Sequence, residues 1–144
     1  MKHLLSLLFV VLGSSLAQGG EHLGAVPGIP IVLEAGRYWD VSPSELAAAL
    51  DVPQRSFVLV NVHIPYEGAL SGTDAFIPYN AIEANLAALP EDKGAEIVLY
   101  CMSGRMSELA AATLVGLGYT NVKSLAGGMI AWKNAGLPLE DFDR

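Results

Sequence analysis

The stretch Ile97-Val98-Leu99-Tyr100-Cys101-Met102-Ser103-Gly104-Arg105-Met106-Ser107 decides the fold and contains the only cysteine of the chain. Its apolar start predicts a buried strand, its Ser-Gly pair predicts a tight loop, and apolar residues at helical spacing predict a helix from about Met106 to Leu117. In such a unit, the N–H groups of the loop and the positive end of the helix dipole face one point. We therefore expect Cys101 to be a nucleophile.

Segments of the same kind flank this unit on both sides. The almost continuously apolar run 57–62 predicts a central parallel strand that helices cover on both faces. Ser42 followed by Pro43 and Glu45 predicts a capped helix start. The remaining strands are expected at 38–41, 75–77, 96–100 and 121–124, and helices at 43–50, 80–89, 106–117 and 129–135. This alternation predicts an α/β fold with a central, mainly parallel sheet of about five strands and helices on both faces.

Composition limits the classes of partner. A chain of 144 residues is long enough for one domain with a single core. The net charge of -7 and the pI near 4.7 argue against nucleic acids and anionic membrane surfaces, which attract clustered Lys and Arg. Any site for an anion must therefore rely on local backbone dipoles and on Arg105.

The inventory of metal ligands is small. One cysteine cannot form an internal disulfide, and His3, His22 and His63 lie at spacings that match no metal motif. We expect no structural metal and no cofactor.

The N-terminal segment predicts export. Residues 1–17 have a basic start, a short apolar run and small residues that end at Ala17, which is the layout of a secretory signal peptide. The apolar run is shorter than the roughly 20 residues of a spanning helix, so we expect cleavage near Ala17 and no stable membrane anchor. The mature protein would be periplasmic or extracellular. Residues 18–36, rich in Gly and Pro, predict an extended arm or linker before a domain at 37–144.

Three pieces of the chain resemble a rhodanese domain, the sulfurtransferase family, over roughly residues 38–139. They are the strand 58–62, the cysteine loop 101–107 and the tail 125–138. The tail is the most specific piece, with a Gly-Gly pair before a helix, Trp132 four residues later and an Ala-Gly-Leu-Pro end.

The resemblance implies a sulfurtransferase with a six-residue active-site loop, Cys101 to Met106. In that family the cysteine attacks a small anionic sulfur donor such as thiosulfate, holds the sulfur as a persulfide, and passes it to cyanide or a thiol. Arg105 is expected to pair with the sulfonate of the donor, because guanidinium binds oxyanions bidentately. The residues expected to bind substrate are Met102, Ser103, Gly104, Arg105, Met106 and Ser107.

The sequence departs from the family pattern at three positions. The family usually has an acidic residue where this chain has Asn61, an arginine where it has His63, and often an arginine where it has Met106. Asn61 replaces the family's acidic residue and Met106 replaces its arginine. The two replacements are physically consistent with each other, because losing one member of a buried ion pair would leave the other charge unpaired. The loop after His63 also departs from the common pattern. We expect a reshaped rim around the cysteine with Asn61, His63, Tyr66 and Glu67.

Several alternatives stay open from the sequence. Cys101 can be a small buried hydrophobe, Arg105 a solvated charge, and His63 a loop histidine bonded to backbone. The domain can be a catalytically silent module that binds a protein or a sulfur carrier. A cysteine-dependent phosphatase or arsenate reductase is less favoured, because those loops place arginine six residues after the cysteine, where this chain has Ser107. The physiological donor and acceptor and the oligomeric state stay open.

Overall fold

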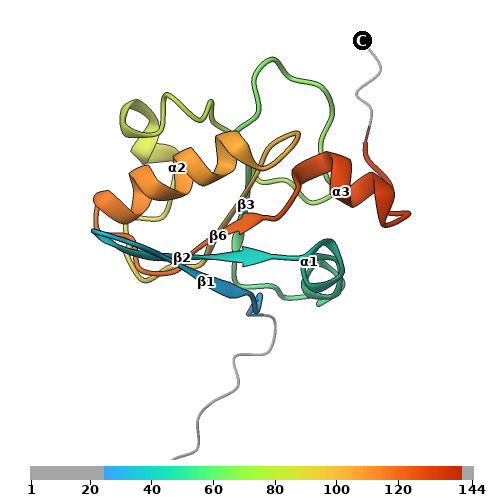
Figure 1. Ribbon diagram of the computed structural model, residues 1–144, viewed down its shortest axis with the longest axis horizontal. Helices are drawn as coiled ribbons and strands as arrows, with labels where there is room; N and C mark the ends of the chain where they lie inside the picture. Colours follow the sequence, from blue (N-terminus) through green and yellow to red (C-terminus); the bar gives the residue numbers. More distant parts are fainter. Residues whose placement is uncertain (1–24, 141–144) are drawn as a thin grey trace, which may run out of the picture.

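The computed structural model describes residues 25–140, which form a six-stranded sheet with helices on both faces (Figure 1). The strand order is β1-β2-β6-β5-β3-β4, and every neighbouring pair is parallel except β1 with β2. The expected α/β class is therefore confirmed, with six strands in place of about five. The expected signal peptide lies outside the described residues. The strands are β1 Ile29–Leu33, β2 Gly36–Val41, β3 Val58–Asn61, β4 Ala75–Phe76, β5 Ile97–Tyr100 and β6 Val122–Leu125.

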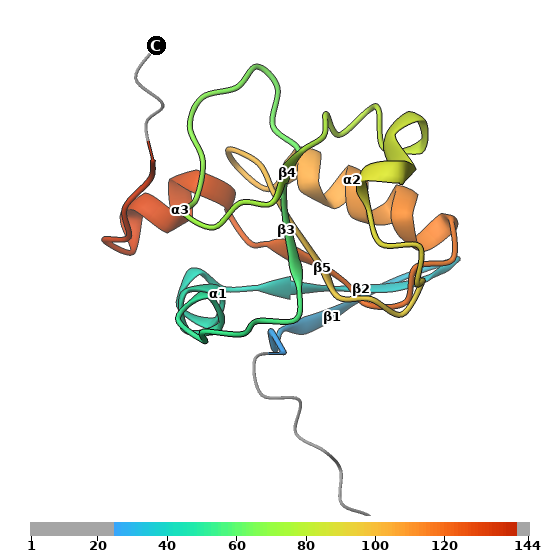
Figure 2. The same ribbon diagram turned by 180° about the vertical axis from the view of Figure 1, so that it is seen from behind.

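The helices divide between the two faces of the sheet. One core joins α2 (Arg105–Gly116) and the 3-10 helix η1 (Glu83–Ala88) to the sheet, and the other joins α1 (Pro43–Leu50) and α3 (Gly128–Asn134) to its opposite face (Figures 1 and 2). Strand β5 contributes to both cores, because successive side chains of a strand point to opposite faces. Its alternate residues Ile97 and Leu99 lie in the first core, together with Cys101. Among residues 25–140, no helix is long and apolar enough to cross a membrane.

The start of α1 follows the predicted capping pattern. The amide of Glu45 donates to the Ser42 hydroxyl, and the Glu45 carboxylate accepts from the amide of Ser42. This reciprocal pair satisfies two N–H groups at the helix start that the helix itself cannot bond. The sequence alone therefore located this helix correctly, from Pro43 to Leu50.

Part of the expected arm at 18–36 belongs to the sheet. Residues 29–33 form β1, which pairs antiparallel with β2 after a two-residue turn. The Gly and Pro content of residues 18–36 predicted a linker, but Pro30 is tolerated in β1 because β1 is an edge strand. Val26, which is 1% exposed, packs in the second core, and its amide donates to Glu96.

The expected helix at 80–89 is a distorted 3-10 helix. Asn85 has backbone angles outside the helical region, with φ at -123°, and its side chain donates to the carbonyl of Ala81. Side-chain bonds of this local kind compete with regular helix hydrogen bonds. The observed helix, Glu83–Ala88, is therefore shorter than expected and is not an α-helix.

The topology places the candidate functional segments at the carboxyl ends of the parallel strands. Parallel strands β3 and β5 end side by side, since Asn61 is the register partner of Tyr100. Ligand sites of open α/β sheets lie outside these carboxyl ends. The residues that follow are Cys101 after β5 and a long loop after β3, which arches away from the sheet before it returns as β4 (Figure 2).

Candidate active site

Cys101 lies at the bottom of the loop between β5 and α2. The residue is 1% exposed, and its Sγ accepts hydrogen bonds from the amides of Gly104 at 3.1 Å and Ser107 at 3.4 Å. Gly104 takes a left-handed conformation, with φ at 104°, and caps the start of α2. Two converging N–H groups at a helix N-terminus favour negative charge on the sulfur.

The Gly127-Gly128 pair holds this loop from the side of α3. The amide of Met129 donates to the carbonyl of Cys101 at 2.9 Å, and the amide of Ile130 donates to the carbonyl of Met102 at 3.0 Å. Gly128 has φ at 59°, and a Cβ there would lie 2.6 Å from the Met102 carbonyl oxygen. Only glycine lets the two backbones approach this closely, which gives the tail motif a physical reason.

A hydroxyl pair lies behind the cysteine. Ser107 Oγ is 3.6 Å from Cys101 Sγ, 2.9 Å from the carbonyl of Gly104 and 2.8 Å from the hydroxyl of Ser124. Both serines are fully buried. No sequence motif singled out Ser124, although a small polar residue within a buried strand signals a buried hydrogen bond.

The other predicted substrate contacts differ in exposure. Ser103 and Arg105 are exposed, whereas Met102 and Met106 are half-buried. Arg105 is the first residue of α2, and no ion pair of it occurs within residues 25–140. Its guanidinium is therefore available to an oxyanion.

Asn61, His63 and Glu67 organise the loop after β3. The Asn61 side chain accepts from the amide of His63 at 3.0 Å and donates to the carbonyl of Gly68 at 3.0 Å. His63 Nε2 lies 2.6 Å from a carboxylate oxygen of Glu67. Asn61 thus closes the loop by hydrogen bonds to backbone, and His63 bonds to a side chain.

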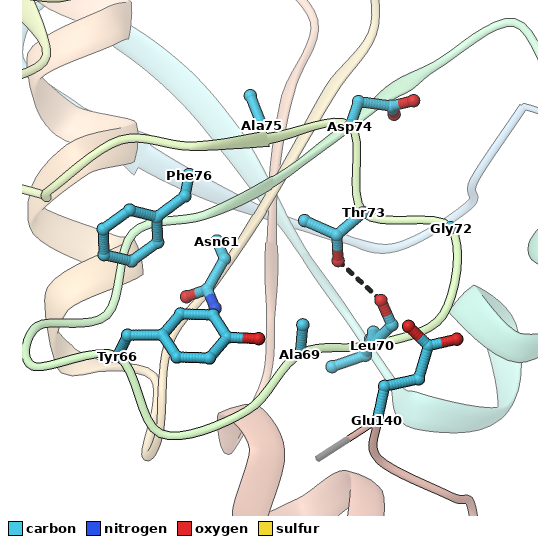
Figure 3. A pocket seen from close by; sticks show the side chains of 10 residues that line it. All are labelled: Asn61, Tyr66, Ala69, Leu70, Gly72, Thr73, Asp74, Ala75, Phe76 and Glu140. Atoms are coloured by element: carbon cyan, nitrogen blue, oxygen red, sulfur yellow. Dashed lines mark hydrogen bonds between the residues drawn. The ribbon is translucent and has the colours of Figure 1, made fainter. Parts of the chain in front are cut away.

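Asn61 and Tyr66 also line a separate cavity of about 450 Å³ (Figure 3). The rings of Tyr66 and Phe76 meet edge to face there, with centroids 5.7 Å apart. The wall contains no residue of the cysteine loop, so the cavity and the thiol are distinct features. Its wall is formed by Asn61, Tyr66, Ala69, Leu70, Gly72, Thr73, Asp74, Ala75, Phe76 and Glu140.

Acidic groups lie beside the hydroxyl pair. Asp40 on β2 is the register partner of Ser124. Burial raises the pKa of the Asp40 carboxyl, and the negative charge of Glu108 raises it further. Burial and the charges of Asp40 and Glu108 also raise the pKa of Tyr38. Negative charge is therefore disfavoured at Asp40 on this side of the sheet.

Metal binding has no support in the described part of the chain. Residues 25–140 contain no group of three or more His, Cys, Asp or Glu side chains placed to hold a metal ion.

Comparison with known proteins identifies the family. The family model of the rhodanese-like domain matches residues 44–135 of this chain. A sulfurtransferase of Allochromatium vinosum is 38% identical over 84 residues, which cover 57% of this chain and 77% of that protein. A tRNA uridine(34) hydroxylase of Erwinia tasmaniensis is 32% identical over 74% of this chain, although the match spans only 32% of the hydroxylase. A thiol in an amide-lined loop on an α/β sheet defines the class, and the chain belongs to the rhodanese-like domain family.

Solved structures agree with this fold. The rhodanese-like domain of an Anabaena protein has a TM-score of 0.62 at 23% identity and covers 72% of this chain and 79% of that chain. A rhodanese-related protein of Thermoplasma volcanium has a TM-score of 0.59 at 21% identity, with 70% and 96% covered. These likenesses show the fold alone.

Proposed function

We propose that this protein is a sulfurtransferase that carries a sulfane sulfur as a persulfide on Cys101. One observation carries the proposal: the amides of Gly104 and Ser107 both donate to Cys101 Sγ. Such donors stabilise a thiolate, and they would stabilise the terminal sulfur anion of a persulfide in the same loop. The family and the name of the Allochromatium relative support this chemistry.

The first half-reaction loads the sulfur. The Cys101 thiolate attacks the outer sulfur of thiosulfate, an S–S bond to Sγ forms, the S–S bond to the sulfonate sulfur breaks, and sulfite leaves with that electron pair. Exposed Arg105 is suited to hold the sulfonate oxygens while the bond breaks. The other loop residues, Met102, Ser103 and Met106, would form the walls around the donor.

The second half-reaction unloads the sulfur. Cyanide or a thiolate attacks the outer sulfur of the persulfide, and thiocyanate or a new persulfide leaves. The electron pair of the broken S–S bond returns to Cys101 as thiolate, so the cycle needs no external oxidant or reductant. The amides that stabilise the thiolate make Cys101 a good leaving group.

Intact mass spectrometry tests the loading step directly. Because Cys101 is the only cysteine, a gain of one sulfur atom after exposure to thiosulfate reports this residue. Wild type should gain the sulfur and lose it on addition of cyanide, with thiocyanate released. Cys101→Ser should stay folded and gain nothing.

The alternatives give different results in the same assays. A folded wild type that gains no sulfur from thiosulfate or other sulfane-sulfur donors would contradict the sulfurtransferase and support a binding module. Hydrolysis of an aryl phosphate that depends on Cys101 would instead support a phosphatase.

We also propose that the protein acts outside the cytoplasm. The layout of residues 1–17 supports this compartment. N-terminal sequencing of the exported protein should find Gln18 as the first residue. Leu8→Arg interrupts the apolar run and should keep the protein in the cytoplasm. An unprocessed wild type found in the cytoplasm would contradict the proposal.

A further inference from the structure

We infer that Ser124 is a positioning residue of the sulfur-transfer site: its hydroxyl donates to Ser107 and so turns the Ser107 proton toward the cysteine loop. Ser124 lies on β6, outside the loop that carries the nucleophile. The inference rests on Cys101 acting as a thiolate, and it extends the proposed function to a residue whose hydroxyl bonds to Ser107 and not to the sulfur within residues 25–140.

The direction of the bond between the two hydroxyls follows from the number of protons and acceptors around them. Ser107 Oγ has one proton and three neighbours within reach: the Gly104 carbonyl, the Ser124 hydroxyl and Cys101 Sγ. Ser124 is fully buried, and within residues 25–140 its hydroxyl bonds only to Ser107. A buried hydroxyl proton needs an acceptor. The proton of Ser124 therefore goes to Ser107 Oγ.

Because Ser124 donates to Ser107, the proton of the Ser107 hydroxyl is left to bond to an acceptor in the cysteine loop. With a neutral Cys101 thiol, Ser107 donates to the carbonyl of Gly104 at 2.9 Å. When the thiolate forms, rotation of the same hydroxyl gives the sulfur a third donor beside the amides of Gly104 and Ser107. A hydroxyl that accepts one hydrogen bond is a stronger donor of the next, because hydrogen bonds in a chain polarise one another. Ser124 thus favours the anion through Ser107.

The charged groups around the pair are few and identifiable. Asp40 from β2 is the register partner of Ser124, and Glu108 and Arg105 lie on α2 beside Ser107. Tyr38 faces the same core from β2. The negative charges of Asp40 and Glu108 disfavour a thiolate at Cys101. The hydroxyls of Ser124 and Ser107 therefore supply a stabilisation of the thiolate that these two carboxylates do not.

A double-mutant cycle tests the inference. The readouts are the ultraviolet absorbance of the thiolate as a function of pH and the rate of alkylation by iodoacetamide, and both report Cys101 because the chain has one cysteine. Ser124→Ala should lower the alkylation rate at neutral pH by about fivefold, the worth of a typical hydrogen bond. It should also move the absorbance profile to higher pH. Ser107→Ala should have a larger effect.

The decisive variant combines both changes. If Ser124 acts through Ser107, then Ser107→Ala/Ser124→Ala should behave like Ser107→Ala alone. Equal, additive effects would show that Ser124 acts independently and would overturn the inference, as would a Ser124→Ala protein with wild-type absorbance. Thr113→Val is the control and should leave both readouts unchanged. It removes a hydroxyl that bonds to the carbonyl of Leu109 on α2, the helix that also carries Ser107.

A second pair of variants separates the hydroxyl from packing. Ser124→Thr and Ser124→Val have the same shape, and only Thr keeps a hydroxyl. The Thr variant should have the higher thiolate absorbance at neutral pH, and equal absorbance would overturn the inference. These readouts need no sulfur donor. Failure of the relay is therefore distinct from failure of the sulfurtransferase, which appears only in the persulfide mass.

Discussion

The amide of Met129 donates a 2.9 Å hydrogen bond to the carbonyl oxygen of Cys101. This bond joins the first turn of α3 to the residue that carries the thiol, so the geometry of the loop depends on a helix more than twenty residues downstream. Gly128, the residue before Met129, lets the two backbones approach each other, since its φ is 59° and its Cα faces the loop backbone.

Gly128→Ala should strongly destabilise the protein. A Cβ at this position would clash with the carbonyl oxygen of Cys101 and with Met102, in addition to the strain of a left-handed alanine. We expect a loss of about 3 kcal/mol or more in the free energy of unfolding, measured by urea denaturation.

Gly136→Ala is the matched control for this prediction. Gly136 also has a positive φ, 78°, but nothing lies within 4 Å of its added Cβ. It should cost only about 1–2 kcal/mol, the strain of the left-handed conformation. Equal costs at the two glycines would contradict the argument from close approach.

Asp40→Asn should stabilise the protein at neutral pH. Burial and Glu108 raise the pKa of Asp40 above its ordinary value of 3.8. Between 3.8 and the raised pKa the folded state binds more protons than the unfolded state, so the contribution of Asp40 to stability falls as pH rises through that window. The variant removes this loss. Its melting temperature should exceed that of wild type at pH 7, with the difference vanishing below the window. A lower melting temperature at pH 7 would contradict the sign.

Lys123→Met should be strongly destabilising. Lys123 Nζ pairs with Glu96, whose Oε1 also accepts the amide of Val26, and both side chains are less than a tenth exposed. Removal of the lysine leaves a buried carboxylate without its cation, at a cost of about 3–5 kcal/mol. Denaturant titration would measure the loss.

The double variant Lys123→Met/Glu96→Gln checks the cause. It removes both charges and keeps a side-chain carbonyl for the Val26 amide, so it should recover much of the lost stability. No recovery would indicate that packing of the lysine stem, and not the stranded charge, is responsible.

Tyr100→Phe should weaken the loop after β3. The Tyr100 hydroxyl accepts from the amide of Leu70 at 3.1 Å and bonds to Thr73 Oγ1 at 2.7 Å. Phenylalanine keeps the packing and leaves a buried amide without its acceptor, at a cost of about 1–3 kcal/mol. Hydrogen exchange of the Leu70 amide should accelerate more than exchange within α2. Unchanged exchange at Leu70 would refute this role.

The sequence by itself determined most of the architecture and the place of the thiol. Apolar runs located the central strands, capping residues located α1, and the Ser-Gly loop located Cys101. These features depend on neighbours in the chain, which is why a linear pattern contains them. Residues 29–33 of the expected arm at 18–36 form β1 because β2 pairs with them, and no pattern within the segment itself specifies that partner.

Only the tertiary structure decided which distant groups act together. The sheet places Ser124 behind Ser107 and separates the cavity of Asn61 and Tyr66 from the thiol. Gly128 matched a family pattern in the sequence, but the reason for glycine there is a backbone contact across the fold. Such contacts are set by strand order and register, which no local pattern specifies. Local physics therefore fixed the elements, and packing between them fixed the surroundings of the sulfur.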